Sequence, residues 1–155
     1  NEDRLAQRKF RTQTITGGKA RGKLLGGNLT VLTALVGTPY LPSFDGAVLF
    51  LEDVDEAEYR IDRMLTQLEQ GGVLTKNLAG VVFGQCTECT GSSAGVYGGF
   101  TVSDVLRQHF GSLGIPAYNG GWFGHITDQF TLPEGGMVEI DADAGTMQLL
   151  EPAVA

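Results

Sequence analysis

The apolar run over residues 46–51 (GAVLFL) constrains the fold more than any other stretch of this sequence. It shows no alternation of apolar and polar residues, which is typical of a β-strand covered on both faces. Two carboxylates, Glu52 and Asp53, follow it directly. Because sites in open α/β sheets gather at the carboxyl ends of strands, Glu52 is a candidate site residue. Asp53 is a reserve for the same role, although strand alternation should point it to the opposite side.

An amphipathic helix is predicted directly after this strand, over residues 55–69. Asp55 is expected to cap it, and Glu56 and Glu58 place negative charge in its first turn, which suits the positive end of a helix. Gly71-Gly72 ends it. The apolar residues at helical spacing are Ile61, Met64, Leu65 and Leu68.

The other segments complete a small α/β domain with a partly parallel sheet and an antiparallel end. Thr101 and Asp104 resemble a capping box at the start of a helix. Two alternating runs flank an Asp- and Gly-rich turn at 141–145, which predicts a closing C-terminal hairpin. The expected strands are 12–16, 79–84, 115–118, 137–140 and 146–150, and the expected helices are 28–36 and 101–110.

Composition excludes several classes of function. The net charge is −7, and the longest basic cluster is Arg8-Lys9-Phe10-Arg11, so we expect no nucleic-acid partner. The apolar runs are far shorter than a membrane span, and no signal peptide is visible, which makes a cytoplasmic setting the expectation. The sequence starts at Asn1 and its first ten residues are polar and charged, so we expect it to begin inside a longer protein.

His125 is the candidate base. It follows a predicted strand within the Gly-rich segment 120–128 (GGWFGHITD). If its strand neighbours that of Glu52, the carboxylate could fix the tautomer of the imidazole and stabilise its cation. A lone histidine in a loop can also be incidental, and spacing alone does not decide between these readings.

The nucleophile that such a pair would activate is missing from the pattern. Residues 91–95 (GSSAG) match the G-x-S-x-G motif literally. A nucleophile elbow needs a strand immediately before it and a helix immediately after it, and neither is predicted here. We interpret the segment as a flexible loop, so the sequence holds an acid and a base with no hydroxyl to activate.

A phosphate-binding loop is nearly matched over residues 17–24 (GGKARGKL). Leu24 stands where a Ser or Thr hydroxyl should hold magnesium, and the preceding run is short and polar. We therefore expect this segment to be a turn that joins strands.

A zinc site would need Cys86 and Cys89 together with His109 and His125. The two histidines are widely separated, and the cysteines lie in a predicted loop. Two cysteines do not make a disulfide framework, so we expect two free thiols and no metal.

Several short motifs occur in a fixed order: 22–29 (GKLLGGNL), 37–40 (GTPY), 51–54 (LEDV), 59–65 (YRIDRML), 82–84 (VFG), 114–116 (GIP) and Gly124-His125. Together they resemble the LD-carboxypeptidase family of serine peptidases, which includes the microcin-immunity hydrolases. The resemblance covers only the C-terminal domain of that family, which we place at 16–155 after a linker or frayed start at 1–15. The N-terminal domain with the nucleophilic serine is expected to lie outside this chain.

The resemblance implies a swivelling β/β/α fold and a cytoplasmic, metal-free enzyme that releases terminal D-alanine from murein tetrapeptides during wall recycling. It implies a Ser-His-Glu triad in which Glu52 and His125 are the acid and the base. It also places Asn28 in the substrate groove, and family members tend to form homodimers. Trp122, next to the Gly-His motif, is a further candidate for substrate contact, although simple packing in the groove is the role we favour.

Two other functions stay open. One is an immunity-type hydrolase of a related peptide or aminoacyl-nucleotide, for which Trp122 could stack on a base. The other is a binding module that keeps the groove without chemistry. The sequence does not decide the exact substrate, the oligomeric state or the role of the cysteines.

Overall fold

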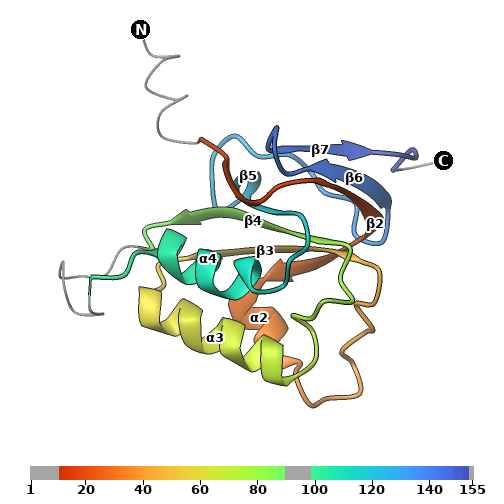
Figure 1. Ribbon diagram of the computed structural model, residues 1–155. Helices are drawn as coiled ribbons and strands as arrows, with labels where there is room; N and C mark the ends of the chain where they lie inside the picture. Colours follow the sequence, from red (N-terminus) through yellow and green to blue (C-terminus); the bar gives the residue numbers. More distant parts are fainter. Residues whose placement is uncertain (1–10, 90–98, 154–155) are drawn as a thin grey trace, which may run out of the picture.

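The computed structural model describes residues 11–89 and 99–153, which form one mixed sheet with helices on one face (Figure 1). The strand order is β1-β5-β4-β3-β2-β6-β7. The inner strands β2 (Lys19–Asn28), β3 (Val48–Val54), β4 (Gly80–Thr87) and β5 (Ala117–Gly124) pair in parallel. The antiparallel strands are β1 (Gln13–Thr16), β6 (Met137–Asp141) and β7 (Thr146–Leu149). The predicted α/β class, partly parallel sheet and closing hairpin are confirmed.

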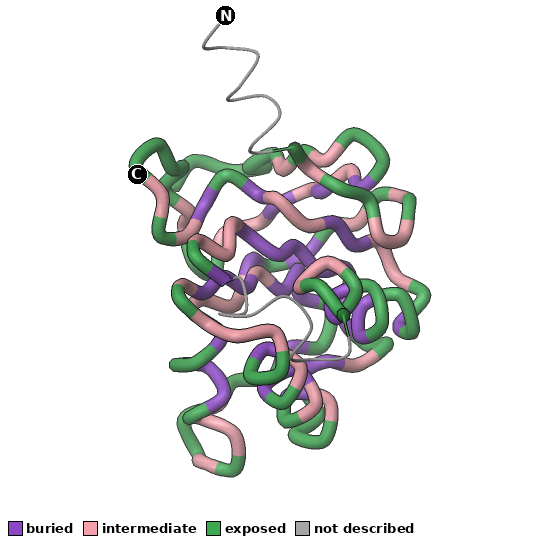
Figure 2. Tube along the Cα trace, turned by 90° about the vertical axis from the view of Figure 1, so that its left-hand side faces the viewer, coloured by how far each residue is buried: buried purple, intermediate pink, exposed green. Residues whose placement is uncertain are grey.

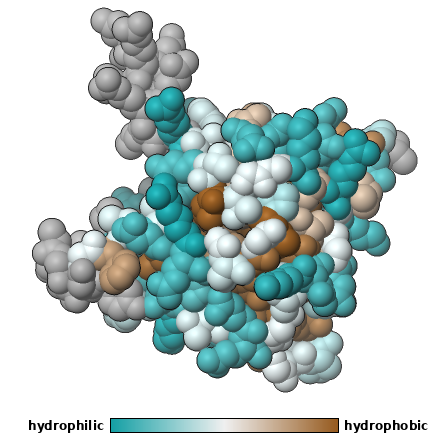
Figure 3. Space-filling model, viewed as in Figure 1, coloured by the Kyte–Doolittle hydropathy of each residue, from teal (hydrophilic) through white to brown (hydrophobic). Residues whose placement is uncertain are grey.

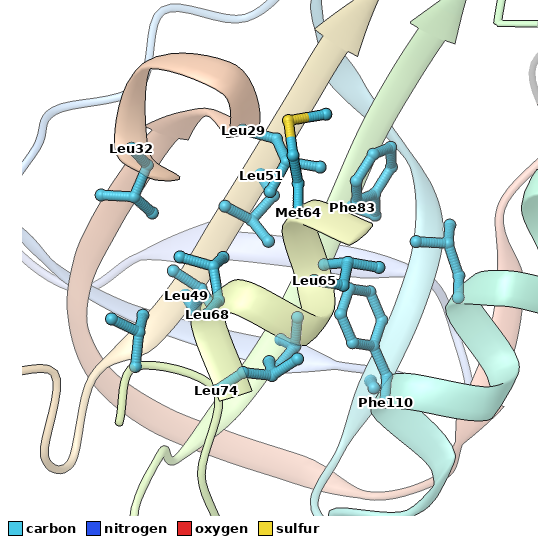
Figure 4. Close-up of a cluster of buried hydrophobic side chains, with 14 of the residues drawn as sticks. Leu29, Leu32, Leu49, Leu51, Met64, Leu65, Leu68, Leu74, Phe83 and Phe110 are labelled. Carbon is cyan, nitrogen blue, oxygen red and sulfur yellow. The ribbon is translucent and has the colours of Figure 1, made fainter. Parts of the chain in front are cut away.

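Three helices cover one face of the sheet: α2 (Leu29–Ala34), α3 (Glu58–Gln70) and α4 (Val102–Gly111). The side chains between the helices and the sheet form the larger apolar core (Figure 4). The apolar stripe predicted for α3 lies in it, with Ile61, Leu65 and Leu68 fully buried. The capping box of α4 is also confirmed, since Thr101 and Asp104 satisfy each other's backbone N–H groups.

The sheet curls at β2, which pairs with two different strands along its length. Its first half, from Lys19 to Lys23, pairs with β6, and its second half pairs with β3. The curl carries β6 over the other face of the sheet, where the side chain of Ile140 lies against Gly80 on β4. A second apolar core forms there, with Leu24, Val48, Val82, Tyr118, Phe123, Val138, Ile140 and Ala142. Burial is therefore concentrated on the central strands (Figure 2).

The turn expected over residues 17–24 is wrong, because these residues lie mostly in β2. Glycine is unfavourable in a β-strand, but here it allows two strand backbones to approach each other closely. A Cβ on Gly22 would lie 2.3 Å from the carbonyl oxygen of Gly46, and one on Gly26 would lie 1.8 Å from that of Phe50. The missing side chains let β2 pair tightly with β3, and no phosphate loop exists here.

The predicted cap at Asp55 is also wrong. Helix α3 begins at Glu58 with Ala57 as its N-cap, and no side chain caps it. Asp55 adopts a left-handed backbone conformation, with φ of 53°, and its N–H donates to the carbonyl of Thr87. It is therefore a turn residue that ties the end of β3 to the end of β4.

Cys86 and Cys89 form a disulfide, so the expectation of two free thiols is wrong. Strand β4 runs on to Thr87 and holds Cys86 in register opposite Asp53 of β3, which brings Cys89 back against it. No cluster of metal-ligating side chains occurs within 11–89 and 99–153. His109 instead lies 2.7 Å from Glu69 and 2.6 Å from Asp62, both on α3. The GSSAG motif and residues 1–10 of the expected linker lie outside the described residues.

Outside the cores the surface is mostly polar, with hydrophobic side chains gathered in the middle of the face seen in Figure 3. Helices α2, α3 and α4, like the rest of the described chain, contain no apolar stretch of the length needed to cross a bilayer.

Candidate active site

Glu52 and His125, 73 residues apart in the chain, meet at the carboxyl edge of the parallel strands. The Nδ1 atom of His125 lies 2.8 Å from Oε2 of Glu52. An ionised carboxylate only accepts hydrogen bonds, so Nδ1–H donates and the lone pair of the neutral ring sits on Nε2. The Glu52 side chain is 12% exposed and that of His125 is 55% exposed. The acid is thus enclosed while the imidazole faces outward.

Glu52 lies on β3 and His125 directly follows β5, two strands that are not neighbours because β4 lies between them. Gly84 lets β5 fold closely over β4, since a Cβ there would lie 2.5 Å from the carbonyl oxygen of Phe123. Gly124 then lies against Glu52 with φ of 117°, a conformation that favours glycine. Thr87 at the end of β4 completes the support by donating a 2.9 Å hydrogen bond to the His125 carbonyl.

Asn28 links the acid to the start of α2. Its Nδ2 group donates to Oε1 of Glu52 at 3.2 Å and to Oδ1 of Asp53 at 3.1 Å. Its Oδ1 accepts from the backbone N–H of Val31 and so caps the helix. The Asn28 amide therefore bridges the carboxylates of Glu52 and Asp53. Contact between Asn28 and a substrate stays a prediction, because both ends of this side chain already have partners within the chain.

Asp53 points away from the histidine, as strand alternation predicts. Its Oδ2 accepts hydrogen bonds from the backbone N–H and the hydroxyl of Thr30 on α2. The side chain is buried on the helix-covered side of the sheet. Its geometry makes it an anchor between β3 and α2.

A cavity of about 500 Å³ opens beside the pair. Phe50 and Phe123 form apolar walls, and their rings pack edge to face with centroids 5.8 Å apart. Sequence reasoning did not identify the segment 129–132, which closes the cavity and carries no motif. It also missed Phe50, although Phe50 lies two residues before Glu52 and strand alternation puts both on one face. No serine or cysteine is among the described residues that line this cavity.

Trp122 lies beside the pair but not in the same cavity. The residue is 39% exposed and lines a second cavity, next to the first. Phe123, the next residue of β5, lines both. Substrate contact by Trp122 stays a prediction.

Tyr118, which also lines the second cavity, gives a titration test of the fold. Burial raises the pKa of Tyr118 from 10.0 to about 12 by disfavouring the phenolate. The stabilisation is complete below pH 10 and is lost as pH rises to about 12, because the unfolded chain ionises first. We expect an absorbance titration to show one of the four tyrosines ionising near pH 12, a phase that Tyr118→Phe removes and Tyr40→Phe does not. A single transition near pH 10 for all four would contradict this burial.

The fold and the site together define an α/β domain in which a buried carboxylate holds an exposed imidazole at the ends of parallel strands, an arrangement that can orient a general base. The comparison with known families agrees: the LD-carboxypeptidase C-terminal domain matches residues 21–140. The chain belongs to this family.

Named relatives show the same affiliation. A Synechocystis protein whose name assigns it to the carboxypeptidases is 43% identical over 86% of this chain and 43% of its own length. The murein tetrapeptide carboxypeptidase of Pseudomonas aeruginosa is 30% identical over 79% of this chain and 39% of its own. The chain thus spans about two fifths of the length of these relatives.

Solved structures share the fold. The muramoyltetrapeptide carboxypeptidase of Oxalobacter formigenes superposes with a TM-score of 0.75 at 32% identity, covering 96% of this chain and 53% of that one. The microcin C7 self-immunity protein MccF, solved in complex with aspartyl sulfamoyl adenosine, superposes with a TM-score of 0.80 at 25% identity, covering 94% and 42%.

Proposed function

We propose that this chain is the C-terminal half of a serine-type LD-carboxypeptidase that releases terminal D-alanine from murein tetrapeptide in peptidoglycan recycling. The observation that carries the proposal is the 2.8 Å contact between Glu52 and His125 at a strand edge, beside an open cavity. The names of the murein-peptide relatives support the substrate class. The residues lining the cavity supply an acid and a base, so the nucleophilic hydroxyl comes from the N-terminal domain that the relatives' greater length suggests.

The proposed mechanism assigns one proton path. Nε2 of His125 takes the proton of the serine hydroxyl while the serine oxygen attacks the carbonyl of the L,D bond. Glu52 holds Nδ1–H and stabilises the imidazolium that forms. The imidazolium then gives its proton to the departing amine of D-alanine, which leaves an acyl-enzyme. A water molecule then attacks the acyl group while it loses its proton to His125, and His125 passes that proton to the departing serine oxygen as the product is released.

A second candidate is an immunity-type hydrolase. The specific observation in its favour is the superposition on MccF, whose complex holds an aspartyl sulfamoyl nucleoside. The same acid and base would serve this reaction, because both cleave an acyl–nitrogen bond. The substrate alone separates the two.

The test uses the whole protein that contains this chain, assayed for D-alanine release from murein tetrapeptide and for cleavage of aspartyl sulfamoyl adenosine. We expect release of D-alanine and a loss of several orders of magnitude in turnover for His125→Gln. The 155-residue chain alone should show no activity. Preferential cleavage of the nucleoside would favour the immunity-type function. Unchanged turnover in His125→Gln would reject His125 as the base in both reactions, and no turnover of either substrate by the whole protein would leave a binding module.

A further inference from the structure

The second cavity, of about 400 Å³, lies next to the Glu52–His125 cavity. It sits over β5 and β7, and its wall includes Tyr118, Trp122, Phe130, Leu132, Met147 and Leu149. The segment 130–132 lines both cavities and forms the partition between them. Its volume lies within the range of about 300–1,000 Å³ that is typical of small-molecule sites.

The walls of this cavity carry no charge. None of the described residues that line it is an Asp, Glu, Lys, Arg or His. Moving an ionised group from water into such surroundings costs far more than moving a neutral one. The cavity therefore selects against charged ligands.

Thr131 and Thr146 also line the cavity, but both residues are exposed, so the hydroxyl of Tyr118 is the buried hydroxyl in its wall. The residue is 2% exposed, yet no partner within the described residues forms a hydrogen bond with this hydroxyl. The hydroxyl oxygen is not fully enclosed by the protein. Because Tyr118 lines the cavity, the oxygen opens into that space. Because the hydroxyl opens into the cavity, a ligand that brings an acceptor would satisfy it, whereas a ligand without one would fill the cavity and leave it unsatisfied.

We propose that this cavity is a binding site for a neutral, ring-sized apolar group bearing one hydrogen-bond acceptor, which the Tyr118 hydroxyl donates to. This site is defined by the residues that line it, and it does not depend on the proposed catalytic role of Glu52 and His125. Since the two cavities share a wall, a ligand in this one contacts the same segment that closes the first.

The chain contains a built-in reporter, because Trp122 is its only tryptophan and lines the cavity. The experiment titrates the 155-residue chain with benzamide, a neutral ring with an amide oxygen, and follows tryptophan emission. Benzoate, of nearly the same shape but charged, is the matched probe. We expect saturable binding of benzamide with a millimolar dissociation constant, at least tenfold weaker binding of benzoate, and no such difference for a free tryptophan derivative.

Tyr118→Phe keeps the ring and removes the hydroxyl. The substitution should weaken the affinity for benzamide about fivefold, which corresponds to the net contribution of one hydrogen bond. Tyr40→Phe, a matched change at a tyrosine that is 81% exposed, should leave the affinity unchanged. Absence of saturable binding by emission and by equilibrium dialysis would overturn the proposal. Equal affinity for benzamide and benzoate would overturn it as well, whatever the variants do.

Discussion

Replacing Glu52 by glutamine in the whole protein is expected to lower kcat by about 10³–10⁴-fold, with little change in KM. The amide can present N–H where Nδ1–H now donates, which favours the wrong tautomer of His125 and removes the charge that stabilises the imidazolium. Geometry changes little, because glutamine has the shape of glutamate. The measurement is D-alanine release from murein tetrapeptide under saturating substrate.

A second carboxylate provides the control for this experiment. Glu56 pairs with Arg60 at the start of α3, away from the cavity residues, so Glu56→Gln should keep kcat within about twofold of the wild type. If Glu52→Gln turned over at the wild-type rate, the proposed role of Glu52 would be wrong. A matching loss in both variants would point to damage to the fold instead.

Gly26→Ala is expected to lower the free energy of unfolding by more than about 3 kcal/mol, through backbone strain together with overpacking. The φ of Gly26 is 151°, and the new methyl group would lie 1.8 Å from the carbonyl oxygen of Phe50. Strands β2 and β3 would have to separate at this point. Urea unfolding followed by circular dichroism measures the change.

Gly27→Ala is the matched control at the next position. Its φ of 140° is also disfavoured for alanine, but a Cβ there meets nothing within 4 Å. It should cost only about 1–2 kcal/mol, from backbone strain. The difference between the two variants isolates the close approach of β2 to β3. Equal losses would show that this contact relaxes at no cost.

Much of the fold follows from local pattern. Three local patterns predict three elements, and all three elements are confirmed. The unbroken apolar run before Glu52 predicts β3, the stripe from Ile61 to Leu68 predicts α3, and the capping box at Thr101 predicts α4. The contact between Glu52 and His125 was expected only if their strands were neighbours. They are not, and the structure joins them across β4 through Gly84 and Gly124.

The errors share one physical origin, which is that long-range pairing overrides local preference. Residues 17–24 have the composition of a turn but pair with β3 and β6. The pattern around Cys86 and Cys89 predicts a loop, but β4 extends further than its apolar run and positions them for a disulfide. The second cavity was also invisible, because Tyr118, Phe130 and Met147 meet only once the sheet has curled.

Because β4 separates the strands of Glu52 and His125, the acid–base pair exists only after three segments have aligned. A partly folded chain that lacked β4 in the middle could hold native helices and yet no site. Recovery of the Glu52–His125 contact during refolding would therefore report the alignment of β3, β4 and β5, which the return of helical signal alone does not.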